Sequence, residues 1–374
     1  MIKRSDFNNF SIVRATGADT FSCTFCPDST DDSESMSVVI PTDGGEPFSV
    51  QLDSVISAVK RAKTELGDIV FARIFLSDPA NQENMTRTRF DFCHPVSIIG
   101  QSPLPGFKIA AWIWTRRNIA VSVESDNMYH VAMGDHDEYW AVTCGCSDGS
   151  SMDQTDCILE DFRHELDNHG LTFQDHCLRT WFFARDIDNS YAGLVVGRNR
   201  MFDRVGLTHD SHFIASTGIA GIAPDPKILV RMDAFASRGF KDLRYLYAED
   251  KMNRTSQYNV RFERGTAVDY SDRRHVFISG TASIDAKGNV VHVGDVKRQV
   301  ERMLENVEAL LSEGGCSFGN VMIMLVYLRD IADYATVNEI FKARFPETPC
   351  LVLHAAVCRP TWLVEMECIA IREL

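Results

Sequence analysis

The sequence of 374 residues lacks several features that would define a class of protein on their own. It has no run of 18 apolar residues, so we expect no helix that crosses a membrane. Residues 1–7 (MIKRSDF) lack the apolar core of a signal peptide. Basic residues are also scarce, because 38 Lys and Arg stand against 52 Asp and Glu, a formal net charge of −14. This balance disfavours nucleic acid as a partner, since phosphate binding requires clustered cations.

Cysteine is present in an odd number, eleven, which argues against a regular disulfide framework. In a chain of this length we expect reduced, mostly buried thiols and a cytoplasmic protein. Cys23 with Cys26, and Cys144 with Cys146, are close enough in sequence to suggest metal binding. Neither pair has a second pair of ligands at usable spacing, so we expect no metal site.

The stretch from Trp362 to Ala370 is the most informative part of the chain. As a strand it would carry Glu365 and Glu367 on one face, together with apolar neighbours. Ionised carboxylates buried without a partner would be costly. One explanation is a strand edge that meets solvent. The other is a carboxyl group in a pocket, with its pKa raised towards neutrality by desolvation, which can deliver a proton.

The segment before this strand has the pattern of a sheet covered by two helices. Apolar residues recur at helical spacing from Val296 to Glu313, and Gly314 ends that helix. A second helix is expected from Ala335 to Phe345, and the expected strands are 275–280, 321–328, 351–357 and 362–371.

The same order of elements occurs three times. We therefore predict an α+β protein of three tandem units, residues 1–123, 124–256 and 257–374, with the first unit degenerate. A single unit exposes one sheet face, and burying it against two neighbours favours an intramolecular pseudo-trimer over three independent domains. The closing strands align Ala110, Arg231 and Glu365, so a proton donor at this position is expected only in the third unit.

Four pieces of the third unit resemble the Rid/YjgF family (endoribonuclease L-PSP fold), whose members are small trimeric enzymes with a chorismate mutase-like fold. They are 278–280 (ISG), 330–338 (DIADYATVN), 346–350 (PETPC) and 363–370 (LVEMECIA). The chain resembles the chorismatase family, built on this fold, more closely. That resemblance runs through 264–266 (RGT), 277–284 (FISGTASI), Cys358 with Arg359, and 179–181 (RTW).

The two resemblances imply different reactions. In Rid enzymes an Arg two positions before a Cys holds the substrate carboxylate, and here Thr348 stands at that position before Cys350. Imine deamination is therefore disfavoured, because losing a bidentate clamp is not a conservative change. Chorismatases hydrolyse the enol-pyruvyl ether of chorismate, release pyruvate and use no metal or organic cofactor. Glu365 matches their catalytic Glu.

The resemblance also suggests the residues that bind substrate. They are three arginines for carboxylates, a cysteine that bears on product type, and the Ser-Gly pair of a strand: Arg264, Arg359, Arg179, Cys358, Ser279 and Gly280. For each arginine an ion pair with an acidic residue is the alternative, and for Cys358 a core thiol. Arg198 and Arg200 are interpreted as a solvated helix face.

We thus expect a chorismatase-like hydrolase acting on a small, anionic, cyclic carboxylate. It would work as a monomer or as a homo-oligomer of pseudo-trimers, without nucleic-acid or membrane partners. The alternatives are a Rid-type enamine or imine deaminase and a non-catalytic protein of the same fold that binds a small ligand.

Overall fold

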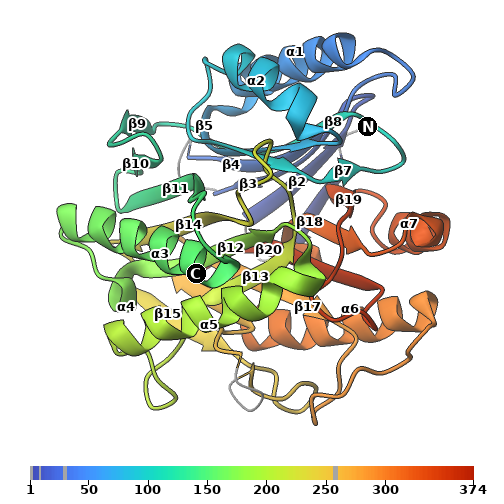
Figure 1. Ribbon diagram of the computed structural model, residues 1–374. Helices are drawn as coiled ribbons and strands as arrows, with labels where there is room; N and C mark the ends of the chain where they lie inside the picture. The colour runs from blue at the N-terminus through green and yellow to red at the C-terminus, as the bar shows by residue number, and fades with distance from the viewer. Residues whose placement is uncertain (1–2, 8–9, 28–31, 256–259) are drawn as a thin grey trace.

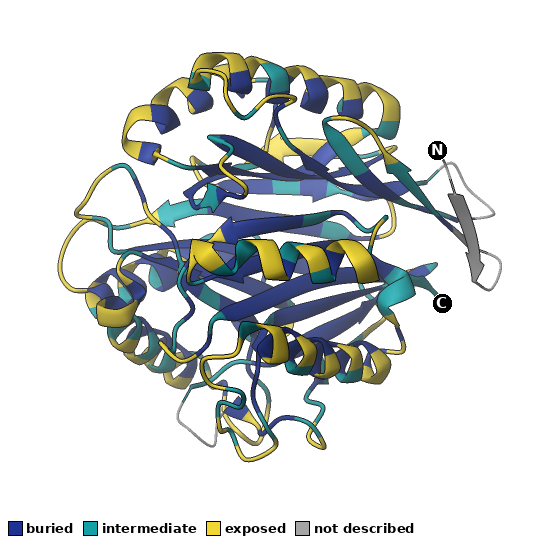
Figure 2. Cartoon of the chain, turned by 90° about the vertical axis from the view of Figure 1, so that its right-hand side faces the viewer, coloured by how far each residue is buried: buried dark blue, intermediate teal, exposed yellow. Residues whose placement is uncertain are grey.

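The computed structural model describes residues 3–7, 10–27, 32–255 and 260–374. Three mixed sheets lie in the interior, and the long helices cover their outer faces (Figure 1). Figure 2 shows the helices striped with exposed residues and the strands almost wholly buried. The expected α+β fold of three Rid-like units, each a mixed sheet with helices, is confirmed.

The first sheet has seven strands in the order β1-β2-β3-β4-β8-β5-β6. Its first helix follows Pro47 and its second begins with Pro79, and the buried residues of the first helix recur at three- and four-residue spacing. The elements are β1 (Lys3–Phe7), β2 (Phe10–Thr16), β3 (Thr20–Cys26), β4 (Glu34–Val39), α1 (Phe48–Leu66), β5 (Asp68–Leu76), α2 (Pro79–Arg89), β6 (Val96–Gly100) and β8 (Ile109–Arg116).

The second sheet has six strands in the order β13-β12-β14-β11-β10-β9. Its first helix starts with a capping box between Ser150 and Asp153. The elements are β9 (Ala120–Val123), β10 (Met128–Ala132), β11 (Asp137–Gly145), α3 (Ser151–Asn168), α4 (Phe173–His176), β12 (Cys177–Ala184), α5 (Ile187–Val205), β13 (Ala215–Ala220) and β14 (Val230–Arg238).

The third sheet has the order β15-β16-β17-β20-β18-β19-β7, so one short strand comes from the first unit. Asp295 caps its long helix by accepting from the Arg298 N–H. The elements are β7 (Ser102–Pro103), β15 (Asp242–Leu246), β16 (Gly265–Asp269), β17 (Arg273–Ala282), α6 (Val296–Glu313), η2 (Phe318–Asn320), β18 (Val321–Leu328), η3 (Ile331–Asp333), α7 (Tyr334–Arg344), β19 (Cys350–His354) and β20 (Val364–Glu373).

The three units contact one another cyclically. Strand β13 of the second unit contacts β17 of the third, β18 of the third contacts β3 and β4 of the first, and β6 of the first contacts β11 of the second. Their inner faces share one apolar core, in which Trp140 stacks on Phe71 and Phe235 with centroids 4.5 and 4.6 Å apart. Each sheet therefore buries its inner face against the other two, as the pseudo-trimer prediction requires.

Some details differ from the sequence-based expectations. The connection between β14 and β16 contains the strand β15, which is not among the strands expected from the sequence. Strand β9 ends at residue 123 yet belongs to the second sheet, so the boundary drawn after residue 123 does not follow sheet membership. The boundary between residues 256 and 257 lies outside the described residues. The division into 1–123, 124–256 and 257–374 remains a prediction.

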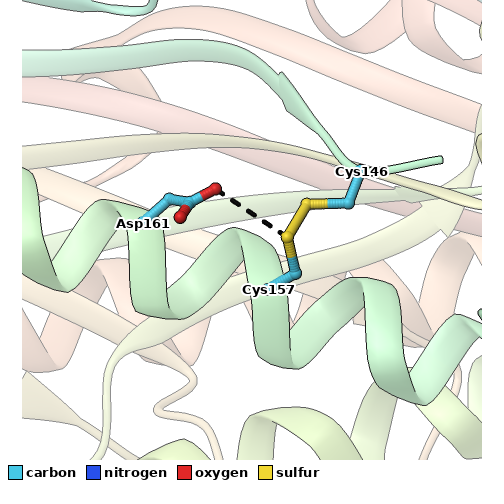
Figure 3. A group of neighbouring side chains, drawn as sticks. All are labelled: Cys146, Cys157 and Asp161. Atoms are coloured by element: carbon cyan, nitrogen blue, oxygen red, sulfur yellow. Dashed lines mark hydrogen bonds between the residues drawn. A yellow bond between two sulfur atoms is a disulfide. The ribbon is translucent and has the colours of Figure 1, made fainter. Parts of the chain in front are cut away.

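The prediction of reduced thiols is wrong for two cysteines. Cys146 and Cys157 are joined by a disulfide, with Asp161 one helical turn further along α3 (Figure 3). The contact drawn from Cys157 Sγ to Asp161 Oδ2 is 3.8 Å long, and a disulfide sulfur has no proton to donate across it. Metals bind thiolates, so in its oxidised form this trio is not a metal centre. The pairing depends on how the loop that carries Cys146 meets α3, which the sequence pattern does not show.

Among the described residues no helix is both long and apolar enough to cross a membrane.

Candidate functional site

A cavity lies between the second and third units, where β13 approaches β17 and β20. Its empty volume, counted out to the open mouth, is about 540 Å³. It is lined by Tyr191, Arg198, Ser216, Gly218, Val260, Phe262, Arg264, Gly280, Ala282, Ile284, Cys358, Arg359, Trp362 and Glu365. Five of the seven residues expected in the site line this one cavity.

Glu365 is the acidic residue of the cavity wall. It lies on β20 opposite Ala282 of β17 and Tyr327 of β18, and only 4% of it is exposed. Burial raises the pKa of its carboxyl, the nearby Glu367 raises it further, and Arg264 and Arg179 lower it, giving about 8. The group is therefore mostly a neutral acid near pH 7 and can donate a proton. A strand edge that meets solvent, the alternative interpretation, is excluded for this residue.

Gly280 makes room for this acid. A Cβ added to Gly280 would lie 2.2 Å from Glu365 Oε1 and 3.1 Å from Thr217 Cγ2, so only glycine leaves the carboxyl its position. Ser279, the other half of the expected pair, faces the opposite way. Its hydroxyl donates to the Glu263 carbonyl at 2.6 Å and accepts from the Ser216 N–H at 2.9 Å. Ser279 thus joins two units behind the wall, and the expectation that it binds substrate is corrected to a structural role.

Three arginines line the cavity from different segments. Arg264 precedes β16, and one of its nitrogens donates to the Asn253 carbonyl at 3.1 Å. Arg359, in the connection between β19 and β20, donates to the Gly288 carbonyl at 3.2 Å and lies 4.5 Å over the Trp362 ring. Both guanidinium groups are thus held by neighbouring groups while they line the cavity, and their positive charge suits an anion.

Arg198, the third arginine, was interpreted from sequence as solvated, and that interpretation is wrong. It is 1% exposed and lines the cavity from α5, whereas Arg200 is exposed and pairs with Asp156 at 3.2 Å. Tyr191 lies seven residues earlier on the same helix, hence on nearly the same face, and lines the cavity too. This spacing was the signal in the sequence. The spacing alone does not tell which face of α5 packs against another unit.

Arg179 does not reach the cavity. It is buried on β12, and its Nη2 donates to Glu367 Oε2 at 2.5 Å and to Thr217 Oγ1 at 2.5 Å. The alternative weighed for Arg179, an ion pair with an acidic residue, is therefore correct, and the expectation that it binds a substrate carboxylate is withdrawn. From this buried position its positive charge still affects the site, because Arg179 is among the groups that lower the pKa of Glu365.

Cys358 lines the cavity as a neutral thiol. Burial, with a further contribution from the charge of Glu365, raises its pKa to about 12. The thiolate is the nucleophilic form of cysteine, so a covalent role for Cys358 near pH 7 is disfavoured.

The inter-unit position equivalent to Glu365 in the second unit is closed. Arg231 donates to both carboxylate oxygens of Glu83 at 3.1 Å and to the Ile98 carbonyl at 2.8 Å. Both side chains are buried, so this ion pair between β14 and α2 fills the space that a ligand would need.

Thr348 also belongs to another interface. It lines a cavity between the first and third units, where the facing wall is formed by apolar residues of β3 and β4. In the third unit Tyr327 pairs with Leu353 and Glu365, and in the second unit Phe183 pairs with Ile219 and Arg231. Leu353 therefore corresponds to Ile219. Thr348 lies five residues before Leu353, so its counterpart in the second unit, which faces the Glu365 cavity, is Ile214. Ile214 is buried and apolar. The arginine that holds the substrate carboxylate in Rid enzymes is therefore also missing beside the Glu365 cavity. The residue at that position is Ile214, and not Thr348 as the sequence suggested.

Comparisons with known proteins agree with this architecture. A family model described as endoribonuclease L-PSP matches residues 263–372. A RutC family protein of Pyrococcus abyssi is 36% identical over 100 residues, which are 26% of this chain and 79% of that protein. The 3-aminoacrylate deaminase RutC of Acinetobacter baylyi is 34% identical over 97 residues, 25% of this chain and 77% of that protein.

Among solved structures, the crystal structure of a chorismatase covers 90% of this chain and 98% of its own, with a TM-score of 0.65 and 19% identity. At this identity the likeness concerns the fold. It covers 90% of this chain, whereas the relatives found by sequence match about a quarter of it, 26% and 25%.

Proposed function

Because this chain belongs to the endoribonuclease L-PSP (RutC) family and pairs a neutral buried acid with three arginines, we propose that it is an enol-ether hydrolase of the chorismatase type. Its substrate would be chorismate or a related cyclic carboxylate with an enol-pyruvyl group. The observation that carries the proposal is Glu365, with a pKa of about 8, in the same cavity as Arg198, Arg264 and Arg359.

The reaction adds water to an enol ether. Glu365 donates its proton to the terminal methylene carbon, which becomes a methyl group and leaves an oxocarbenium ion. Water adds to that ion and returns a proton to the Glu365 carboxylate. The hemiketal then loses its hydroxyl proton and forms the ketone of pyruvate as its bond to the ether oxygen breaks. That oxygen takes up a proton and remains on the ring as a hydroxyl group. The products are pyruvate and a cyclic alcohol.

The arginines suit a substrate with two carboxylates. Guanidinium groups bind carboxylates through charge-assisted hydrogen bonds, and the three come from separate segments, so they can hold two anionic groups apart. The fixed positive charge also stabilises the ionised Glu365 that forms after proton transfer. Cys358, beside the acid, is the candidate for deciding which product forms.

A deaminase is the second candidate, because 3-aminoacrylate deaminase RutC is 34% identical over 97 residues of this chain. Against it stands Ile214, which offers no charge where Rid enzymes use arginine. A protein of this fold that only binds a small anionic ligand is the third candidate, and turnover separates it from the other two.

The experiment is incubation of the protein with chorismate while pyruvate release is followed by a coupled lactate dehydrogenase assay. We expect release by the wild type and a decrease of about 10²- to 10⁴-fold in Glu365→Gln, the range for loss of a general acid. Parallel incubations with 2-aminoacrylate and 3-aminoacrylate, followed by ammonia release, test the deaminase. No pyruvate from folded wild type contradicts the hydrolase, and equal release by both proteins contradicts the role of Glu365.

A further inference from the structure

Glu367 lies two residues after Glu365 on the same face of β20, at the centre of a buried polar cluster. It accepts hydrogen bonds from Arg179 Nη2 (2.5 Å), Trp181 Nε1 (3.0 Å), Thr217 Oγ1 (2.5 Å) and the Tyr327 hydroxyl (2.8 Å). Burial and the charge of Glu367 raise the pKa of Tyr327 well above its usual value, so that phenol remains a donor. Every partner donates, which is the pattern of an ionised carboxylate held in one orientation.

Thr217 connects this cluster to the cavity wall. It lies on β13 between Ser216 and Gly218, which both line the cavity, but its own side chain is 1% exposed and points away from the cavity. While its hydroxyl donates to Glu367, it accepts from the backbone N–H of Gly280 at 2.9 Å.

Gly280 is therefore held between Thr217 and the acid. The contacts that a Cβ at Gly280 would make, with Glu365 Oε1 on one side and Thr217 Cγ2 on the other, show how closely the three residues pack. A shift of the Gly280 backbone would change the space in which the Glu365 carboxyl lies.

We propose that Thr217 is a positioning residue: its hydroxyl ties the Gly280 backbone to the fixed Glu367 carboxylate and so holds the Glu365 carboxyl in its orientation towards the cavity. The effect on turnover rests on the function proposed above, whereas the effect on the carboxyl itself does not. Proton transfer to carbon depends on alignment, and a displacement of about 1 Å can cost about 10²-fold in rate.

The same cluster gives the two carboxyls of β20 different surroundings. Glu367 accepts four hydrogen bonds, whereas the neighbouring charge of Glu367 adds to burial in raising the pKa of Glu365 to about 8. Two neighbouring carboxyl groups can take different roles in this way because their environments differ.

Three variants test the proposal. Thr217→Val keeps the volume and removes the hydroxyl, Thr217→Ser keeps the hydroxyl, and Thr115→Val is the matched control. Thr115 is also fully buried in a strand, β8, and its Oγ1 has no hydrogen-bond partner among the described residues. We expect Thr217→Val to lower kcat for pyruvate release by about 10- to 100-fold with KM within about threefold. Thr217→Ser and Thr115→Val should keep kcat within about threefold of the wild type.

A second measurement needs no turnover. The infrared C=O band of the protonated Glu365 carboxyl, assigned by its loss in Glu365→Gln, reports the hydrogen bonds and orientation of that group. We expect Thr217→Val to displace this band and Thr115→Val to leave it unchanged.

The outcomes separate the two proposals. A wild type that releases no pyruvate contradicts the proposed function, and the infrared comparison alone then decides on Thr217. A folded Thr217→Val with an unchanged band contradicts the positioning role, whether or not the wild type turns over. A loss of kcat in Thr217→Val that Thr217→Ser does not restore also contradicts it, because the cause would then be the packing around β13 and not the hydroxyl.

Discussion

Gly280 and Glu365 are in such close contact that a single methyl group on the former would lie 2.2 Å from a carboxyl oxygen of the latter. The backbone of β17 and the acid of β20 therefore share a space that only glycine leaves open.

Gly280→Ala is the first prediction. Because the added Cβ must push the carboxyl aside, we expect pyruvate release to fall by about 10²-fold, comparable to other misalignments of a reacting group. Steady-state kinetics with chorismate measures the effect. Gly206→Ala, at the end of α5, is the control, since a Cβ there meets no atom within 4 Å and its cost is confined to backbone strain at φ +77°. Equal activity of Gly280→Ala and wild type would argue against Glu365 as the acid.

The second prediction concerns the pH dependence of the rate. The active form of a general acid is the protonated one, and the pKa of Glu365 is about 8. We expect kcat/KM for pyruvate release to be level below that pH and to fall tenfold per pH unit above it. Rates measured from pH 6 to 10 check this. A rate that rises through pH 8 would mean that the carboxylate acts as a base.

The third prediction concerns the pH dependence of stability. The folded chain binds the proton of Glu365 more tightly than the unfolded chain, whose carboxyl has a pKa near 4.5. The free energy of unfolding that Glu365 contributes is therefore fully present below about pH 4.5 and is lost as pH rises towards 8. Glu365→Gln removes this loss, so the variant should gain stability relative to the wild type between pH 5 and pH 9. Urea unfolding at both pH values measures the difference, and a constant difference would contradict the raised pKa.

The fourth prediction distinguishes arginines that bind substrate from those that do not. Loss of a charge-assisted hydrogen bond costs about 1.5–3 kcal/mol, so Arg264→Met should raise KM for chorismate by about 10- to 100-fold. Arg200→Met is the control on the exposed side of α5 and should change KM less than twofold, because a surface ion pair contributes little. Similar effects of the two substitutions would indicate a general electrostatic influence of arginines.

The fifth prediction concerns the closed position between the first and second units. Arg231→Met leaves the buried Glu83 carboxylate with only the half-exposed Arg87 as a cationic partner, at 2.9 Å, and should destabilise the fold by up to about 3–5 kcal/mol. The double variant Arg231→Met, Glu83→Gln should recover most of that loss, because no charge remains buried. Urea unfolding of the four proteins of this cycle measures the coupling. Additive effects would mean that the pair is not an interacting unit.

Elements encoded by neighbouring residues could be predicted from the sequence, whereas contacts between distant segments could not. The helix 296–313 and the strand 321–328 were predicted to the residue, because their periodicity and their ends are encoded locally. The acid was found because two carboxylates in an apolar strand are unusual in any context. Arg179 was misjudged because its partner Glu367 is 188 residues away, and Arg198 because the burial of α5 depends on another unit. The Cys146–Cys157 pairing likewise depends on how a loop meets a helix.

The ion pair of Arg231 with Glu83 has a consequence for how such a molecule diverges. In a trimer of identical subunits, one codon change alters all three interfaces at once. No single interface can therefore replace its site by a structural ion pair while the others keep theirs. Joining the three copies in one polypeptide gives each interface its own codons, and Ala110, Arg231 and Glu365 have become different residues. A tight-binding inhibitor should accordingly titrate with a stoichiometry of one per chain, where a trimer of Rid subunits would take three.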